Sequence, residues 1–237
     1  QPRLIECGYP LIDDQIAEYD QRTSGRDVGE KGADRPVVLI APSWQEESIL
    51  DVCIDEILDA LLGHGYRVIV RPHPEYTKRY RARWEALLER YGQASEEDLY
   101  FEHDFSTSDA IFDSDVLITD WSSIPCEFSF ATHRPCIFID TPMKVGNPDW
   151  KAFGMDPTDI TLRDHIGRSL SVDELAALPA VIEDMLVHAD AWKERILAVR
   201  EGFIYNLGSG SEMAGAYILD ALLKRQDAKE VRAHGEA

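Results

Sequence analysis

The sequence predicts an α/β protein with a Rossmann-like, doubly wound parallel sheet. Short, continuous apolar runs recur along the chain, as they do in strands that helices cover on both faces. Patterns typical of helices separate these runs, and strands that alternate with helices imply right-handed crossovers and a parallel sheet. The 237 residues, 44% of them hydrophobic, suffice for one large domain with its own core.

The predicted strands and helices alternate along most of the chain. We expect strands at 37–41, 66–70, 99–101, 116–119 and 136–139. We expect helices between them over about 47–62, 77–91, 108–112 and 120–131. From residue 149 the pattern changes to a loop region up to about 169, followed by helices that begin near 171, 191 and 211.

Charge and composition exclude several classes of function. Lys and Arg number 24 against 44 Asp and Glu, so the net charge is −20. Because such a field repels nucleic acids and anionic membranes, we expect neither as a partner, and any anion site must be local. The cysteines form no CxxC pair, so we expect no metal site, no disulfide framework and a cytoplasmic setting. No apolar run reaches the roughly 18 residues of a membrane span.

Polar side chains that could bind a ligand follow the predicted strands. In a doubly wound sheet, ligands bind at the carboxyl ends of the strands. The candidates that follow the first, second and fourth strands are Ser43, Trp44, Arg71, His73, Asp120, Ser122 and Ser123. Arginine, histidine and serine side chains of this kind are typical of a cleft that recognises phosphate.

The turn Arg71-Pro72-His73-Pro74 is the sharpest of these features. Each proline fixes its own φ and biases the residue before it toward an extended conformation, so both cationic side chains leave a stiff strand end. Residues 65–90 hold seven Lys and Arg against three Glu, a local balance of +4 that an anion site would need. The alternative is a solvated basic helix with a packed histidine.

Two predicted helix starts could also hold a phosphate. Asp120, Ser122 and Ser123 precede one helix, and Gly208-Ser209-Gly210-Ser211 opens the last one. Backbone N–H groups and the helix dipole favour an anion at such a start. The alternative in each case is ordinary capping, which needs no ligand.

At these residues the sequence resembles the CDP-glycerol glycerophosphotransferase family, the teichoic-acid and capsule polymerases of bacteria. The matching segments are Gly8-Tyr9-Pro10 with Asp13, Ala41-Pro42-Ser43-Trp44, Arg71-Pro72-His73-Pro74, the run from Ser114 to Ser123, and Arg134-Pro135-Cys136-Ile137-Phe138. The resemblance implies a GT-B fold, in which two Rossmann-like domains enclose the active site, and this chain would be the carboxyl-terminal, donor-binding half.

The resemblance also implies a division of the chain. Residues 1–36 would be a linker and a return segment from a missing first domain. Residues 37–226 would form the nucleotide-diphosphate-binding domain, and 227–237 would be a frayed tail. The first residue is Gln1 rather than Met, so we interpret the chain as a piece of a longer protein, although a processed Met would look the same.

The implied reaction is attack of an acceptor hydroxyl on the β-phosphate of CDP-glycerol, with CMP as the leaving group and no obligatory cofactor. His73 and Arg71 would be the catalytic residues at the donor's phosphates, Ser122 and Ser123 would hold the pyrophosphate, and the loop from Gly208 would close over the nucleotide. A polymer or lipid-linked acceptor would bind through the missing domain, which could also attach the protein to the inner membrane face.

Two alternatives stay open at this point. One is a GT-B glycosyltransferase or epimerase half that uses a UDP- or CMP-sugar and reacts at carbon. The other is a nucleotide-binding module without catalysis. For the phosphotransferase that the resemblance implies, the base that activates the acceptor would lie in the missing domain, so we expect the isolated chain to bind nucleotide and to transfer little or nothing.

Overall fold

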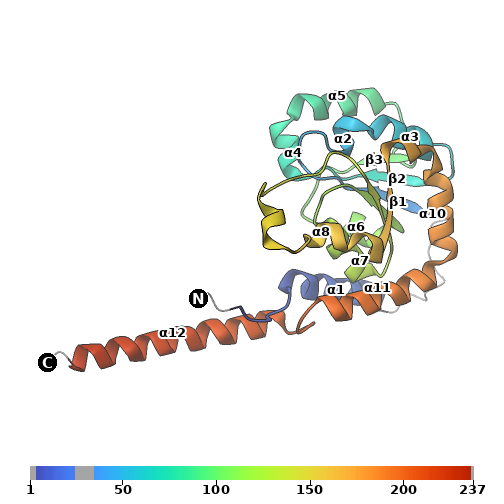
Figure 1. Ribbon diagram of the computed structural model, residues 1–237. Helices are drawn as coiled ribbons and strands as arrows, with labels where there is room; N and C mark the ends of the chain where they lie inside the picture. The colour runs from blue at the N-terminus through green and yellow to red at the C-terminus, as the bar shows by residue number, and fades with distance from the viewer. Residues whose placement is uncertain (1–3, 25–34, 236–237) are drawn as a thin grey trace.

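The computed structural model describes residues 4–24 and 35–235, with side chains up to residue 226. Its centre is a six-stranded sheet with the order β3-β2-β1-β4-β5-β6 (Figure 1). Every neighbouring pair of strands is parallel. The strands are β1 (Val37–Ile40), β2 (Arg67–Val70), β3 (Leu99–Phe101), β4 (Val116–Thr119), β5 (Cys136–Ile139) and β6 (Gly167–Leu170). This is the doubly wound order, in which the chain direction across the sheet reverses between β1 and β4.

Helices cover both faces of the sheet. In Figure 1, α2 to α5 lie on one side of the strands, and α1, α6 and α7 lie on the other. The described helices are α1 (Pro10–Thr23), α2 (Ile49–Val52), α3 (Ile54–Leu61), α4 (Pro74–Arg79), α5 (Arg81–Tyr91), α6 (Asp109–Asp113), α7 (Ile124–Thr132), η1 (Trp150–Phe153), α8 (Thr158–Thr161), α9 (Arg163–Ile166), η2 (Val172–Ala177), α10 (Leu178–Val187), α11 (Ala189–Phe203) and α12 (Gly210–Gly235).

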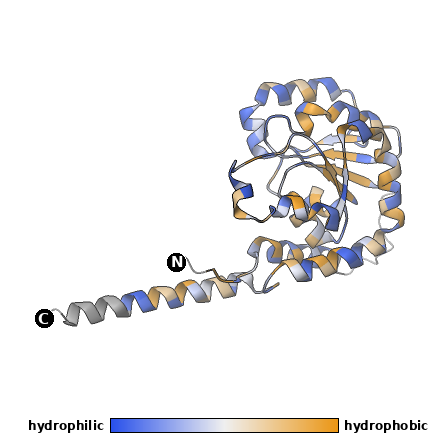
Figure 2. Cartoon of the chain, viewed as in Figure 1, coloured by the Kyte–Doolittle hydropathy of each residue, from blue (hydrophilic) through white to orange (hydrophobic). Residues whose placement is uncertain are grey.

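The strands are apolar on both faces because helices bury both faces. All four residues of β1, of β4 and of β5 are buried, and Figure 2 shows these central strands as the apolar middle of the domain. The bounds of the five predicted strands are confirmed to within about a residue at each end.

Two predicted helices are each divided, one at Cys53 between α2 and α3 and one at Tyr80 between α4 and α5.

The sixth strand, β6, lies where the sequence predicted a loop. It pairs with β5 at the edge of the sheet, and its two central residues, Arg168 and Ser169, are exposed. A half-exposed edge strand lacks the continuous apolar run that marks the central strands. Gly167 begins it, and a Cβ there would lie 2.1 Å from the carbonyl oxygen of Cys136, so the close pairing requires glycine.

Helix α1 lies within the segment that the sequence assigned to a linker. Pro10 begins the helix, where its missing N–H costs nothing. Ile12 is fully buried, and Gln15 Nε2 donates to Glu127 Oε2 of α7 at 3.2 Å. Within the segment 1–36, predicted to be a linker and a return segment, Pro10–Thr23 therefore forms a helix that packs on the domain, and the part at 25–34 lies outside the described residues.

Helix α12 leaves the body of the domain in Figure 1. Its backbone is helical from Gly210 to Gly235, a range that includes most of the tail predicted from residue 227. Among the described residues, none of the helices combines the length and the apolar character that crossing a bilayer requires.

Candidate functional site

The candidate site lies at the carboxyl edge of the sheet, where the strand order reverses. The register aligns Val70 of β2 with Ile40 of β1, and Ile40 with Ile118 of β4. Neighbouring strands are about 4.8 Å apart, so the loops after β2 and β4 leave the sheet about 10 Å from each other on either side of the β1 loop. The loops after β2, β1 and β4 are therefore neighbours at this edge of the sheet.

His73 is held at the start of α4 with a defined tautomer. Its backbone is extended, Pro74 follows it as the first helical residue, and its Nδ1 accepts the backbone N–H of Glu75 at 3.0 Å. Burial, and next the positive charge of Lys144, lower the pKa of His73. The ring is therefore neutral at pH 7, and because Nδ1 is an acceptor, its proton lies on Nε2. That N–H group is a hydrogen-bond donor for a ligand.

Cationic groups gather around the half-buried indole of Trp44, which follows β1. The Arg79 guanidinium carbon lies 5.0 Å and the Lys144 ammonium nitrogen 4.9 Å from the centre of the ring. The imidazole of His73 lies 6.4 Å from it, centre to centre. Sequence reasoning missed Lys144, because its loop after β5 carries no motif. The only available signal was its place shortly beyond a strand's carboxyl end.

Arg71, predicted as a phosphate contact, is paired inside the protein. One guanidinium nitrogen lies 2.6 Å from Glu102 Oε2, and the two side chains are only 13% and 7% exposed. The other nitrogen donates to the carbonyl oxygen of Thr107 at 3.3 Å. Glu102 thus largely balances the charge of Arg71, and the pair stiffens the turn that presents His73.

Asp120 and Ser43, predicted to bind substrate, are buried under the site. The carboxylate of Asp120 accepts the backbone N–H of Ser43 at 2.7 Å and that of Ile49 at 3.0 Å. Asp120 is 2% and Ser43 1% exposed. Both oxygens of Asp120 accept these hydrogen bonds, so the residue holds the β1 loop in place, and direct ligand contact by Asp120 stays a prediction.

Ser122 and Ser123 stand at the start of α7, as predicted. Ser123 is the exposed N-cap residue, and its hydroxyl makes no capping hydrogen bond. Ser122 Oγ accepts the N–H of Ile124 at 3.4 Å. The indole N–H of Trp121 donates to the carbonyl oxygen of Thr141 at 2.9 Å and joins this turn to the loop after β5. The hydroxyl of Ser123 is therefore not used to cap α7 and can form a hydrogen bond with a ligand.

The glycine loop, by contrast, lies against the amino-terminal segment. The carboxylate of Asp13 accepts the N–H of Gly208 at 2.7 Å and that of Gly210 at 3.0 Å. The hydroxyl of Ser209 donates to the carbonyl oxygen of Asn206, and Ser211 is exposed. Figure 1 shows this start of α12 beside α1 and away from α4. The loop therefore lies away from His73 at the start of α4, and Asp13 already accepts two of its amide N–H groups.

The net positive charge around the His73 turn is smaller than the +4 counted from the sequence of residues 65–90. Most of its cations form exposed ion pairs with carboxylates of α2 to α5. These pairs are Lys78 and Arg79 with Glu75, Arg81 with Glu85, Arg83 with Asp51, and Arg90 with Asp55. The field at the site therefore depends on the few cations next to Trp44.

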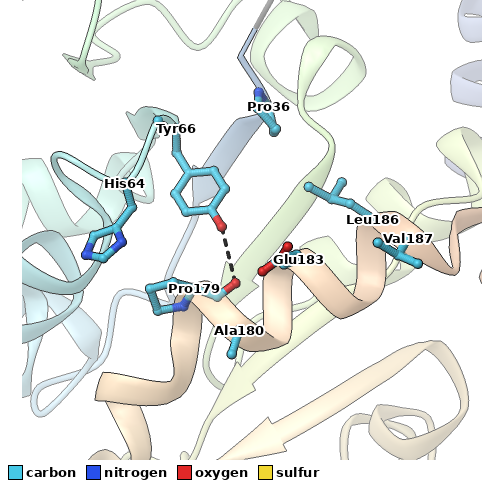
Figure 3. Close-up of a pocket in the computed structure, with 9 residues that line it drawn as sticks. Pro36, His64, Tyr66, Pro179, Ala180, Glu183, Leu186 and Val187 are labelled. Atoms are coloured by element: carbon cyan, nitrogen blue, oxygen red, sulfur yellow. Dashed lines mark hydrogen bonds between the residues drawn. The ribbon is translucent and has the colours of Figure 1, made fainter.

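A surface hollow of about 730 Å³ lies elsewhere, at the amino ends of β1 and β2 (Figure 3). Pro36 and Tyr66 line it from the sheet, and the hydroxyl of Tyr66 donates to the carbonyl oxygen of Pro179 at 3.2 Å. It is at the opposite edge from the candidate site. Among the side chains described in 4–24 and 35–226, no three His, Cys, Asp or Glu residues lie so that they could hold a metal ion.

Comparison with known proteins identifies the fold. The wall teichoic acid polymerase TagF, solved with CDPG, is 20% identical with a TM-score of 0.48, and the match covers 96% of this chain and 52% of that one. A putative UDP-N-acetylglucosamine 2-epimerase from Listeria monocytogenes is 13% identical with a TM-score of 0.53, covering 94% and 53%. The UDP-GlcNAc 2-epimerase of Methanocaldococcus jannaschii, in complex with UDP-GlcNAc and UDP, is 13% identical with a TM-score of 0.52, covering 90% and 54%. The predicted fold class, a Rossmann-like half of a GT-B fold, is confirmed.

The chain spans about half the length of these solved structures. No curated protein matches it in sequence. The sequence model of the family described as CDP-Glycerol:Poly(glycerophosphate) glycerophosphotransferase matches residues 1–155, which include α1, the strands β1 to β5 and the serine turn before α7, but not the glycine loop. This chain belongs to the CDP-glycerol:poly(glycerophosphate) glycerophosphotransferase family.

Proposed function

We propose that this chain is the donor-nucleotide-binding domain of a CDP-glycerol or CDP-alditol phosphotransferase that builds a teichoic-acid-like or capsular polymer. One observation carries the proposal: His73 follows β2 and Ser123 follows β4, the strands on either side of β1, where the strand order of the sheet reverses. His73 has a donor N–H at Nε2, and the hydroxyl of Ser123 makes no capping hydrogen bond. Doubly wound sheets bind phosphorylated ligands at this point.

The proposed reaction is a displacement at phosphorus. The acceptor hydroxyl attacks the β-phosphate of CDP-glycerol, the bond from that phosphorus to the bridging oxygen breaks, and the bridging oxygen leaves with CMP. Negative charge develops on the leaving phosphate, so fixed donors there lower the barrier. His73 Nε2–H would supply a hydrogen bond or a proton to that phosphate.

Other predicted residues contribute through position in this proposal. The Arg71–Glu102 pair stiffens the turn that carries His73, and Asp120 fixes the loop that carries Trp44. Ser122 and Ser123 would hold the pyrophosphate at the helix start. We assign no ligand contact to the loop from Gly208, because Asp13 already accepts its N–H groups.

The acceptor would bind through a further domain, which would also supply the base that activates the hydroxyl. We therefore expect this chain by itself to bind nucleotide and to catalyse little or no transfer. Its proposed location is the cytoplasm, where CDP-activated donors would be available, with any attachment to the inner membrane face made by the rest of the protein.

Calorimetric titration with CDP-glycerol, CMP and a UDP-sugar tests the proposal. We expect saturable heats with the two cytidine nucleotides and weaker binding of the UDP-sugar. Binding of the UDP-sugar with no heat from either cytidine nucleotide would instead identify a sugar-nucleotide enzyme. In the protein that carries both domains, His73→Asn should abolish most transfer; unchanged transfer would point to a nucleotide-binding module.

A further inference from the structure

Lys144 differs from the other cations at the carboxyl edge of the sheet. Arg71 is paired with Glu102, Arg79 with Glu75, and Arg163 with Asp140. The ammonium group of Lys144 forms no ion pair with any carboxylate in the described part of the chain. In a protein with a net charge of −20, an unpaired and half-buried lysine is an exception.

Two hydrogen bonds hold the start of the loop that carries Lys144. Gln45 Nε2 of the β1 loop donates to the carbonyl oxygen of Pro142 at 2.8 Å, and the Trp121 indole donates to that of Thr141 at 2.9 Å. The ammonium nitrogen itself lies 4.9 Å from the centre of the Trp44 ring. The start of the loop after β5 is thus fixed to the loops after β1 and β4, and its lysine lies over Trp44, close enough to His73 to lower the pKa of that ring.

We propose that Lys144 is a phosphate-binding residue of the nucleotide donor, and that Lys144 and His73 together hold the diphosphate beside Trp44. This proposal rests on the proposed function, because it assigns a residue to the same site. Partial burial removes water from the ammonium group, and a bound anion would supply the counter-charge that the protein does not. The positive charge of Lys144 contributes to the depressed pKa of His73, which agrees with the proximity of the two side chains.

The test compares Lys144→Met with a matched lysine. Lys151 also lies over an indole, with its ammonium nitrogen 5.4 Å from the centre of the Trp150 ring. Unlike Lys144, it is not among the charged groups that shift the pKa of His73. We expect Lys144→Met to weaken CDP binding by roughly tenfold and to leave cytidine binding unchanged, because only CDP carries phosphate. Lys144→Arg should restore most of the affinity, and Lys151→Met should bind like the native chain.

Native-like CDP affinity in Lys144→Met, or an equal loss in Lys151→Met, would overturn the assignment. UDP serves to separate this inference from the proposed function. If the native chain binds UDP and not CDP, the cytidine specificity is wrong, and Lys144 is then judged by the same tenfold criterion with UDP. Binding of neither diphosphate would refute both the proposed function and the role of Lys144.

An NMR titration gives a readout without nucleotide. Lys144→Met should raise the pKa of His73, and an unchanged titration midpoint would contradict the proximity of the two side chains.

Discussion

The strand-end edge and the glycine loop both carry the sequence marks of a phosphate site, and the structure separates them. At the strand ends, the Nε2–H of His73, the ammonium of Lys144 and the hydroxyl of Ser123 have no protein partner that satisfies them in the described residues. At the loop, the carboxylate of Asp13 accepts the N–H groups of Gly208 and Gly210.

The comparison shows that a motif's residue types are not enough to make a site. Glycine amides at a helix start attract any anion, and a carboxylate from the same chain serves as well as a phosphate. Asp13 acts in this way as an internal ligand of α12. The strand ends differ because the charged side chains of Asp120 and Arg71 are buried and paired within the protein, whereas the Ser123 hydroxyl makes no capping hydrogen bond.

Asp120→Ala should have the largest effect on stability. Its loss would leave the buried N–H groups of Ser43 and Ile49 without an acceptor, at a cost of about 4 kcal/mol for two charge-assisted hydrogen bonds. Urea unfolding measures this, with the exposed Asp149→Ala as a control that we expect to change stability by less than about 0.5 kcal/mol. A stable Asp120→Ala variant that fails to bind CDP would show direct ligand contact instead.

Arg71→Met should destabilise the domain by about 3 kcal/mol, because it leaves the buried Glu102 carboxylate unpaired. The double variant Arg71→Met, Glu102→Met should regain most of that loss, since neither charge remains buried. If Arg71 only positions the turn, the double variant also binds CDP. A double variant as stable as the native chain but unable to bind CDP would place Arg71 among the ligand contacts.

Asp13→Ala should cost about 1 kcal/mol, because its hydrogen bonds to Gly208 and Gly210 lie near the surface. Hydrogen exchange should show faster opening at the start of α12, while CDP affinity stays within about twofold. Asp14→Ala is the matched control, an exposed acid one residue further along α1. A large change in CDP affinity with Asp13→Ala would return the glycine loop to the donor site.

The smallest effect concerns pH. Burial, with Lys144, holds the pKa of His73 below its usual value; the stability this contributes is complete above about pH 6.5 and declines as the pH falls through the folded-state pKa. A bound phosphate would favour the protonated ring, so CDP should raise the NMR titration midpoint of His73. His133, whose pKa burial and Arg200 lower to about 4, should not respond to CDP. Equal responses of both histidines would rule out a local effect.

The sequence predicted what depends on continuous patterns. Strands such as β1 and β4 are apolar on both faces because helices cover them, and that run is visible in the residues. The turn at His73 and the helix start at Ser123 were also predictable, since proline and serine have strong local preferences.

The rest depends on contacts that no local pattern records. β6 has exposed central residues, and α1 is mostly polar, with Ile12 fully buried on it. The pairing of Asp13 with the glycine amides and of Arg71 with Glu102 joins residues far apart in sequence. Lys144 reaches Trp44 across the sheet reversal. Only the folded chain shows which polar groups have partners.

The most direct test of the central claim is an NMR titration of the chain with CDP, observed at its backbone amides and indole N–H groups. We predict that the largest shifts occur at the Trp44 indole and at the amides of Ser123 and Ile124, while those of Gly208 and Gly210 stay unchanged. Large shifts at the two glycines with none at Trp44 or Ser123 would contradict the account.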